Sequence, residues 1–309
     1  MRARAQQVLS GVPTLERRLA TVERDRRRGA GELAELVLRG LGAVRPRAGA
    51  PKHRVVTELR RLLADAAHLR PSMAPVGNVP RRVAAEFERR LARSRGRDPF
   101  LAYAAAISGV ENLFATRHAD VTGQFKRHFP RLERVVTISY SSQVADALGA
   151  PRRKRLWVTV CEARPGLEGR TLARKLAGRA GTVELITEAQ IMLAVAEADA
   201  VVLGCDTIES DGSVRNKVGS HSLALAARRS GASVIVLADR FKFRIGKEPG
   251  EEHHPTSEVW RGAPRKVRVL NPYFEVIPAR LIDAVVLEDG VYVPKRLPAL
   301  RRRELERYV

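Results

Sequence analysis

Hydrophobic residues recur at helical spacing through the first third of the chain. Four segments carry apolar residues three and four positions apart, namely 14–22, 31–41, 55–69 and 81–91. Asp98 followed by Pro99 predicts the start of a further helix, because aspartate is a good N-cap and proline fits the first turn. The stretches 45–51 and 70–80 are rich in proline and glycine and are predicted loops. The sequence therefore predicts a helical N-terminal domain over residues 1–122.

The pattern changes from about residue 123 onward. Short β-branched runs predict strands at 134–139, 156–161, 183–186, 200–204, 233–238 and 284–287, and helical runs lie at 142–148, 167–177, 189–196 and 217–227. Strand followed by helix, repeated at this spacing, indicates a mostly parallel sheet with helices on both faces. The predicted fold class is therefore α/β, with a Rossmann-like domain over residues 123–309.

A polar loop follows the β-branched run that ends at Gly204. Asp206 comes two residues later, Asp211-Gly212 predicts a turn, and Asn216 and Lys217 stand at the start of the next predicted helix. In open α/β sheets ligands bind outside the carboxyl ends of the strands, where this loop would lie. The alternative is that Asp206 caps a turn, Asn216 caps the helix and Lys217 is solvated.

Serine hydroxyls follow the first predicted strand of the sheet. Ser139, Ser141 and Ser142 stand where that strand turns into a helix. A hydroxyl there can bind an anion beside the helix N-terminus, or cap the helix. Neither G-x-G-x-x-G after this strand nor G-x-x-x-x-G-K-[ST] anywhere is present, so the two strongest nucleotide fingerprints are missing.

Charge points to an anionic partner. The 309 residues include 56 basic and 34 acidic side chains, a net charge of +22, which attracts polyanions through the summed field of the protein. Arg28 stands before Gly29 and Gly31 at a helix start, and Arg70 stands at a sharp loop entry, so both could hold a phosphate or be plain surface charges. The helical domain lacks the interleaved aromatics and the motifs of nucleic-acid binders, so a nucleic-acid partner ranks behind a phosphorylated small molecule.

Other classes of site find little support. Cys161 and Cys205 are interpreted as buried free thiols, with no disulfide framework. His253 and His254 lack spaced metal-ligand partners and are interpreted as solvated. No run is apolar enough for a signal peptide or a membrane span, so we expect a cytoplasmic protein without a membrane partner. We also expect neither a metal nor a cofactor.

Six groups of residues, in order along the chain, carry a resemblance to a known family. They are Arg28-Gly29-Ala30-Gly31, the loop at Ser139, Glu162-Ala163-Arg164-Pro165 with Gly169, Gly204-Cys205-Asp206 with Asn216-Lys217, Phe241-Lys242-Phe243, and Asn271-Pro272-Tyr273-Phe274-Glu275-Val276. Together they resemble the initiation factor 2B alpha/beta/delta family, which includes methylthioribose-1-phosphate and ribose-1,5-bisphosphate isomerases. The resemblance implies a helical domain before a Rossmann-like domain through which members usually dimerise.

The resemblance also implies a site. Ligand contacts are expected for Arg28, Gly29, Ala30, Gly31, Arg70, Ser141, Ser142, Arg164, Asn216, Lys217 and Lys242. The isomerases use a cysteine after the first sheet strand and an aspartate in the later loop as an acid/base pair. Asp206 matches the aspartate, whereas Ser139 stands at the cysteine position. A serine hydroxyl needs an adjacent base, unlike a thiol that titrates near neutral pH.

Two functions stay open at this point. The first is a regulatory protein of the initiation factor 2B type that holds a phosphorylated sugar or nucleotide without converting it. The second is an aldose–ketose isomerase acting on a sugar 1-phosphate, in which another group replaces the thiol. The missing cysteine favours the first, and Asp206 with the phosphate-binding set favours the second. The resemblance further implies a homodimer or higher homo-oligomer and a protein partner in translation initiation.

Overall fold

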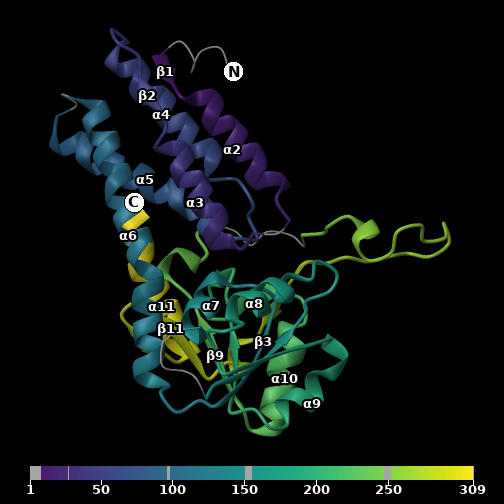
Figure 1. Cartoon of the computed structure of the whole chain (residues 1–309). Helices are drawn as coiled ribbons and strands as arrows, with labels where there is room; N and C mark the ends of the chain where they lie inside the picture. The colour runs from purple at the N-terminus through teal and green to yellow at the C-terminus, as the bar shows by residue number, and fades with distance from the viewer. Residues whose placement is uncertain (1–7, 27, 96–97, 150–154, 247–251, 309) are drawn as a thin grey trace. The chain divides into compact units, whose positions relative to one another are not determined.

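The computed structural model describes residues 8–26, 28–95, 98–149, 155–246 and 252–308. Residues 1–7, on which the expectation about a signal peptide partly depends, lie outside these ranges. The chain forms two compact units, residues 1–116 with 302–309, and residues 117–301 (Figure 1). The predicted domain division at residue 122 falls inside one long helix and stays a prediction.

The first unit is helical, as the apolar periodicity predicts. Its helices are α2 (Val12–Arg24), α3 (Ala30–Leu41), α4 (Lys52–Ala66), α5 (Ala74–Arg93) and α6 (Pro99–His128), the last of which continues into the second unit. Asp98 caps α6, since its Oδ1 accepts from the backbone N–H groups of Phe100 at 3.0 Å and Leu101 at 2.9 Å. A small antiparallel pair, β1 (Leu9–Ser10) and β2 (Arg45–Pro46), was not predicted.

The predicted loop at 70–80 is wrong, because α5 begins at Ala74. Pro75 lies in the first turn, where its missing N–H costs nothing. Pro80 lies inside the helix and removes one backbone hydrogen bond. All seven residues from 74 to 80 are buried, so packing of this turn outweighs the helix-breaking composition.

A seven-stranded sheet forms the centre of the second unit. Its order is β12-β11-β9-β6-β3-β4-β5, with β3 (Arg134–Ile138), β4 (Trp157–Cys161), β5 (Thr182–Ile186), β6 (Ala200–Leu203), β9 (Ser233–Leu237), β11 (Ala284–Leu287) and β12 (Gly290–Tyr292). Neighbouring strands run parallel except β12, which is antiparallel to β11. The α/β class and the mostly parallel sheet are thereby confirmed.

Helices cover both faces of this sheet (Figure 1). On one face α9 (Ile191–Val195) and α10 (Ser220–Ser230) pack on the strands, and on the other α6, α7 (Ser142–Leu148) and α8 (Glu168–Leu176) do so. The five inner strands are near-continuous apolar runs because both of their faces are buried, whereas the edge strands β5 and β12 are partly exposed. The chain ends in α11 (Leu297–Leu305), and short 3-10 turns lie at 188–190, 240–242, 256–258, 279–281, 294–296 and 306–308. Within the described ranges no helix is long and apolar enough to cross a membrane.

A second, three-stranded sheet carries the polar segment after β6. Its antiparallel strands are β7 (Thr207–Ile208), β8 (Val214–Lys217) and β10 (Phe274–Ile277), with β8 in the middle. The Asp211-Gly212 turn is confirmed, since Asp211 Oδ1 accepts from the Ser213 N–H at 2.9 Å and Gly212 has φ +88°. The polar segment is therefore a β-hairpin and not a loop.

The predicted helix start at Lys217 is wrong. Lys217 is the last residue of β8, and α10 begins only at Ser220. Gly219 separates the two elements with φ +101°, and a Cβ there would lie 2.6 Å from Ile138 Cδ1. A residue other than glycine could not make this turn so close to β3.

Candidate functional site

Three of the predicted site residues follow neighbouring strands of the large sheet. Ser139 comes directly after β3, Asp206 three residues after the end of β6, and Lys242 in the 3-10 turn after β9. These three strands are adjacent and parallel, so their carboxyl ends meet at one edge. The loops touch there: a Cβ on Gly204 would lie 2.7 Å from the Cβ of Ser141. That the three residues share one ligand cleft stays a prediction.

The serine loop leaves β3 with a strained backbone. Ser139 is buried and has φ +65°, a left-handed conformation that costs free energy for any residue but glycine. Its N–H donates to the Cys161 carbonyl at the end of β4, at 3.3 Å. Ser141 caps α7 by accepting from the Val144 N–H at 3.4 Å, and Ser142 is the first residue of α7. The loop geometry is therefore set by the sheet and the helix, with Ser139 held between them.

The hairpin places Asp206 beside Asn216 and Lys217. The Asp206 N–H donates to the carbonyl of Arg215, a residue of β8, at 3.0 Å. Asn216 Nδ2 donates to Ser220 Oγ at 3.0 Å, and that hydroxyl donates to the Lys217 carbonyl at 2.6 Å. Lys217 is buried, so the alternative that its side chain is solvated is wrong. Asn216 is buried as well, and neither residue starts a helix.

Lys217 lies in a buried polar cluster that the sequence did not reveal. Its Nζ lies 3.0 Å from Glu168 Oε1 and 3.2 Å from the centroid of the Tyr273 ring. The Tyr273 hydroxyl donates to the same Glu168 oxygen. Burial lowers the pKa of Lys217, and the carboxylates of Glu168, Asp206 and Glu258 oppose that shift by favouring the charged amine.

His254 belongs to the same cluster, and its interpretation as solvated is wrong. The imidazole is buried, stacks on Tyr273 at 3.5 Å between ring centroids, and lies 3.1 Å from Glu252 Oε1 through Nε2. His253 is exposed, as expected. In the part of the chain that is described, no group of three or more His, Cys, Asp or Glu side chains could hold a metal ion. The two histidines therefore do not act as a pair.

A cluster of buried charged side chains stabilises the hairpin. Glu209 accepts from Arg215 Nε at 2.9 Å and from the Arg244 guanidinium at 2.8 Å, and all three side chains are buried. Because the arginines come from β8 and from the segment after the 3-10 turn at 240–242, this carboxylate links the Asp206 hairpin to the Lys242 turn.

The Lys242 turn is held by the buried carboxyl group of Asp239 and the half-buried one of Glu288. Asp239 Oδ1 accepts from the Phe241 N–H and Glu288 Oε1 accepts from the Arg240 N–H, both at 3.0 Å. Asp239 Oδ2 accepts from Gln143 Nε2 at 3.1 Å. Burial, together with the nearby Asp239 carboxylate, raises the pKa of Glu288 to about 8. Glu288 is thus largely protonated at neutral pH.

We expect Glu288→Gln to flatten the pH dependence of stability. The folded pKa of Glu288 lies above its unfolded value, so its contribution is full at low pH and is lost as pH rises through about 8. Between pH 5 and pH 8.5 the wild-type free energy of unfolding should fall by on the order of 2–4 kcal/mol more than that of the variant. Urea unfolding at a series of pH values measures this, with Asp289→Asn at the exposed neighbouring carboxylate as control. Parallel pH profiles for wild type and Glu288→Gln would contradict it.

Both cysteines are buried free thiols, as predicted. Burial, reinforced by Glu188, raises the pKa of Cys161 to about 12. Burial also raises the pKa of Cys205 well above its usual value, although Lys242 acts in the opposite direction. Neither cysteine provides a thiolate near neutral pH.

The first unit brings its own predicted ligand residues together around Asp25. Arg28 reaches Asp25 Oδ2 at 2.6 Å and donates its N–H to Oδ1 at 2.8 Å, while Arg70 donates to the Asp25 carbonyl at 2.7 Å. Arg70 is buried with φ +45°. Gly29 is the N-cap of α3, and Ala30 and Gly31 are its first two residues. Arg28, Arg70 and the start of α3 therefore lie close together in the first unit. Arg164 lies in the second unit and is exposed.

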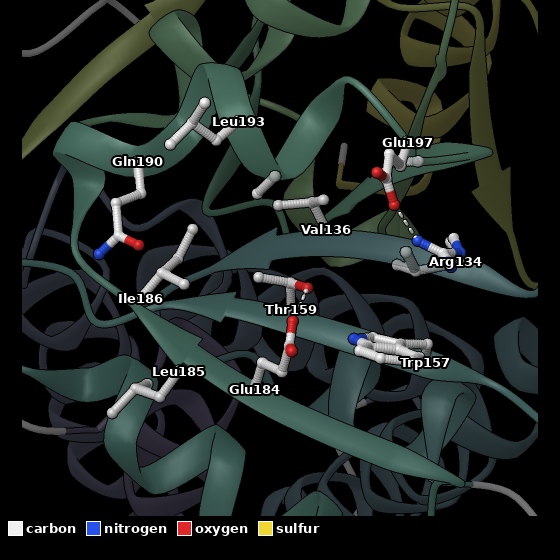
Figure 2. A pocket seen from close by; sticks show the side chains of 13 residues that line it. Arg134, Val136, Trp157, Thr159, Glu184, Leu185, Ile186, Gln190, Leu193 and Glu197 are labelled. Atoms are coloured by element: carbon white, nitrogen blue, oxygen red, sulfur yellow. Dashed lines mark hydrogen bonds and ion pairs between the residues drawn. The ribbon is translucent and has the colours of Figure 1, made fainter.

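A pocket of about 630 Å³ lies elsewhere on the second unit (Figure 2). Residues of β3, β4, β5 and α9 line it. Arg134 and Trp157 are the first residues of β3 and β4, so the pocket reaches the amino ends of these two strands. Four of its polar side chains are paired with one another, Arg134 with Glu197 and Thr159 with Glu184. None of the predicted site residues lines this pocket.

Glu168, Tyr273 and His254 are the residues that sequence reasoning missed. Glu168 directly precedes Gly169, and Tyr273 lies in the segment 271–276, so both stand in segments that carry the resemblance. No spacing rule pairs them with Lys217, because they come from α8 and from the residue before β10. Only the tertiary structure brings them together.

Comparison with known proteins agrees with the fold described. A family model described as the initiation factor 2 subunit family matches residues 26–294. The chain is 34% identical over 164 residues to a Pyrococcus horikoshii protein named translation initiation factor eIF-2B subunit 2-like, covering 52% of this chain and 58% of that protein. It is 37% identical over 161 residues to methylthioribose-1-phosphate isomerase of Pelotomaculum thermopropionicum, covering 48% and 44%. The chain therefore matches about half the length of these relatives.

Solved structures show the same fold over most of the chain. The translation initiation factor eIF-2B of Pyrococcus horikoshii superposes with a TM-score of 0.75 at 23% identity, covering 92% of this chain and 98% of that one. The 5-methylthioribose 1-phosphate isomerase of the same organism superposes with a TM-score of 0.70 at 19% identity, covering 95% and 87%. The family match over most of the chain confirms the resemblance carried by the sequence motifs, and the chain belongs to the initiation factor 2 subunit family.

Proposed function

We propose that this protein binds a phosphorylated sugar or nucleotide at the carboxyl edge of the large sheet in a regulatory role, without converting it. The observation that carries the proposal is the serine after β3, at the position where the resemblance implies a cysteine in the isomerases. Both cysteines of the chain are buried with raised pKa values, so neither replaces that thiol. Asn216, Lys217 and Lys242, to which the resemblance assigns ligand contacts, are present in the unit that carries this edge.

The test is a binding and turnover experiment. Ribose 1,5-bisphosphate or methylthioribose 1-phosphate should raise the midpoint of thermal unfolding of the wild-type protein, because a ligand that binds only the folded state stabilises it. No ketose should form above background, since moving a proton between adjacent carbons needs two groups that exchange protons near neutral pH. Ser139→Cys should then give measurable turnover, while Ser142→Cys, on the same loop, should not.

An aldose–ketose isomerase is the second candidate. It is favoured by the hairpin that sets Asp206 next to Lys217, an amine whose pKa is lowered by burial and which could exchange protons in place of the thiol. Turnover by the wild-type protein that Asp206→Asn abolishes would establish this candidate and overturn the first.

Assembly is part of the same proposal. One solved neighbour is the tetrameric eIF2B-beta2-delta2 complex of Chaetomium thermophilum, with a TM-score of 0.68 at 18% identity. Together with the family membership, this supports an oligomeric assembly, which we propose is a homodimer or higher homo-oligomer in the cytoplasm. A protein partner in translation initiation is proposed on the same basis.

A further inference from the structure

A long loop of the second unit is closed at its base. The His254 N–H donates to the Asn271 carbonyl, and Asn271 Nδ2 donates to the Pro255 carbonyl, both at 3.0 Å. His254 and Asn271 are buried, so this base is a fixed part of the fold. Residues 256–270 form the loop, which is the yellow-green segment that extends away from the sheets of its unit in Figure 1. Its regular structure is the 3-10 turn at 256–258, and loops of this length with so little of it are usually functional.

The 256–270 loop exposes large apolar side chains. Their exposed fractions run from 38% to 58%, and they are Val259, Trp260, Val267 and Leu270. At the turn between them, a Cβ on Gly262 would meet no atom of the described residues within 4 Å. Apolar side chains gathered in water at one place mark a contact surface for a partner.

The same loop carries positive charge without negative charge. From 259 to 270 it has no acidic residue, and its basic residues are Arg261, Arg265, Lys266 and Arg268. All four are exposed, and none of them pairs with a carboxylate of a described residue. Arg215 and Arg244, by contrast, are paired with Glu209 inside the fold. The cations of the loop are therefore available to an anionic partner.

Single-stranded nucleic acid is the polyanion that fits this loop best. Proteins that bind single strands combine cations that contact the phosphates with aromatic side chains on which bases stack. Trp260 stands next to Arg261, so the loop offers both kinds of group. In a duplex the bases are stacked on one another and offer no face to an indole ring. A second copy of the chain is a poorer match, because each copy carries a net charge of +22.

We propose that the 256–270 loop is a binding site for single-stranded nucleic acid, in which Trp260 stacks on a base and the basic residues of the loop contact phosphates. The sequence ranked a nucleic-acid partner second because the helical domain lacks aromatic residues among its cations. The loop lies in the other unit and has that arrangement. It contains none of the residues predicted to bind a sugar phosphate, so this site does not depend on the proposed function.

The test measures binding of fluorescein-labelled oligouridine and oligothymidine, each of about 16 nucleotides, the upper site size of one single-strand-binding domain. Trp260→Ala should weaken the wild-type affinity at least about fivefold, because stacking on a base is lost. Arg265→Ala combined with Lys266→Ala should weaken it at least about tenfold in low salt, and should lower the slope of log affinity against log salt by about 1.4, the value for two phosphate contacts. Arg302→Ala combined with Arg303→Ala is the matched control, because it removes the same charge from exposed positions of α11, and it should stay within about twofold of the wild type.

Tryptophan fluorescence reports the stacking directly. The chain has two tryptophans, so Trp260 is the one that remains in Trp157→Phe. Either oligonucleotide should quench its fluorescence, and high salt should restore it, since salt weakens the phosphate contacts. All the substituted side chains are exposed, so the variants should fold, and circular dichroism checks this.

Several results would overturn the proposal. They are a wild-type protein that binds neither oligonucleotide, an equal loss of affinity in the α11 control, an unquenched Trp260, and tighter binding of a duplex of the same length. A Trp260→Ala variant that changes the oligomeric state in sedimentation velocity but keeps the wild-type affinity for both oligonucleotides would show that the loop is a protein interface instead. A preference for oligouridine or for oligothymidine identifies RNA or DNA as the partner, and either preference supports the site.

Discussion

Replacing Lys217 by alanine is expected to lower the free energy of unfolding by about 3–5 kcal/mol, the range for removing one partner of a buried ion pair. The variant leaves the Glu168 carboxylate, bonded to Lys217 at 3.0 Å in the wild type, buried without its cation. It also removes the ammonium that lies over the Tyr273 ring. Urea unfolding followed by circular dichroism measures the loss.

A double-variant cycle distinguishes the ion pair from simple loss of packing. In a Glu168→Gln background the same Lys217→Ala change should cost clearly less, because no buried carboxylate is left without a partner. Equal costs in the two backgrounds would mean that the pair contributes no coupling. If Lys217→Ala lowers the free energy of unfolding of the wild type by less than about 1 kcal/mol, Lys217 contributes no more than an exposed charge does, which would contradict the expectation from its burial.

Glu209→Gln should have an effect of similar size, about 3–5 kcal/mol, because one change leaves two buried arginines without their shared carboxylate. Arg215 and Arg244 both donate to Glu209, and the three side chains are buried. Urea unfolding at pH 7 measures the loss. Glu197→Gln is the matched control, because Glu197 pairs with Arg134 at the surface with 74% of its side chain exposed, and it should cost about 0–1 kcal/mol.

The same carboxylate adds an acid-dependent component. Burial alone would raise the pKa of Glu209, but the hydrogen bonds and charges of Arg244 and Arg215 lower it below its usual value. A carboxylate with a lowered folded pKa contributes stability that is present above its unfolded pKa and is lost as pH falls through the folded value. The gap between wild type and Glu209→Gln should therefore narrow toward acid pH, and a constant gap would show that Glu209 acts through packing alone.

The large sheet could be predicted because its strands are short runs rich in β-branched residues, and all but the edge strands are buried on both faces. All six predicted strands lie within about a residue of β3, β4, β5, β6, β9 and β11. The helix assigned from Lys217 failed for a physical reason: the segment 214–217 has one apolar residue and no periodicity that marks a strand, so only its pairing with β7 and β10 shows that it is one. The helix at Ala74 failed because burial overrides the composition of its first turns.

The candidate site could be predicted in part. Ser139, Asp206 and Lys242 follow strands, so the rule that ligands gather at carboxyl ends places them at one edge. Glu168, Tyr273 and His254 could not be found this way, because each reaches the Lys217 cluster from an element distant in sequence. Local patterns carry no information about which distant side chains meet inside a fold.

The middle position of β8 in its three-stranded sheet bears on how fast a ligand can exchange. β8 pairs with β7 on one side and with β10 on the other, so the backbone that carries Asn216 and Lys217 is already ordered before a ligand arrives. A segment held in this way loses little conformational freedom when a ligand binds. If the proposed ligand binds here, the ordering of β8 itself would not slow its association.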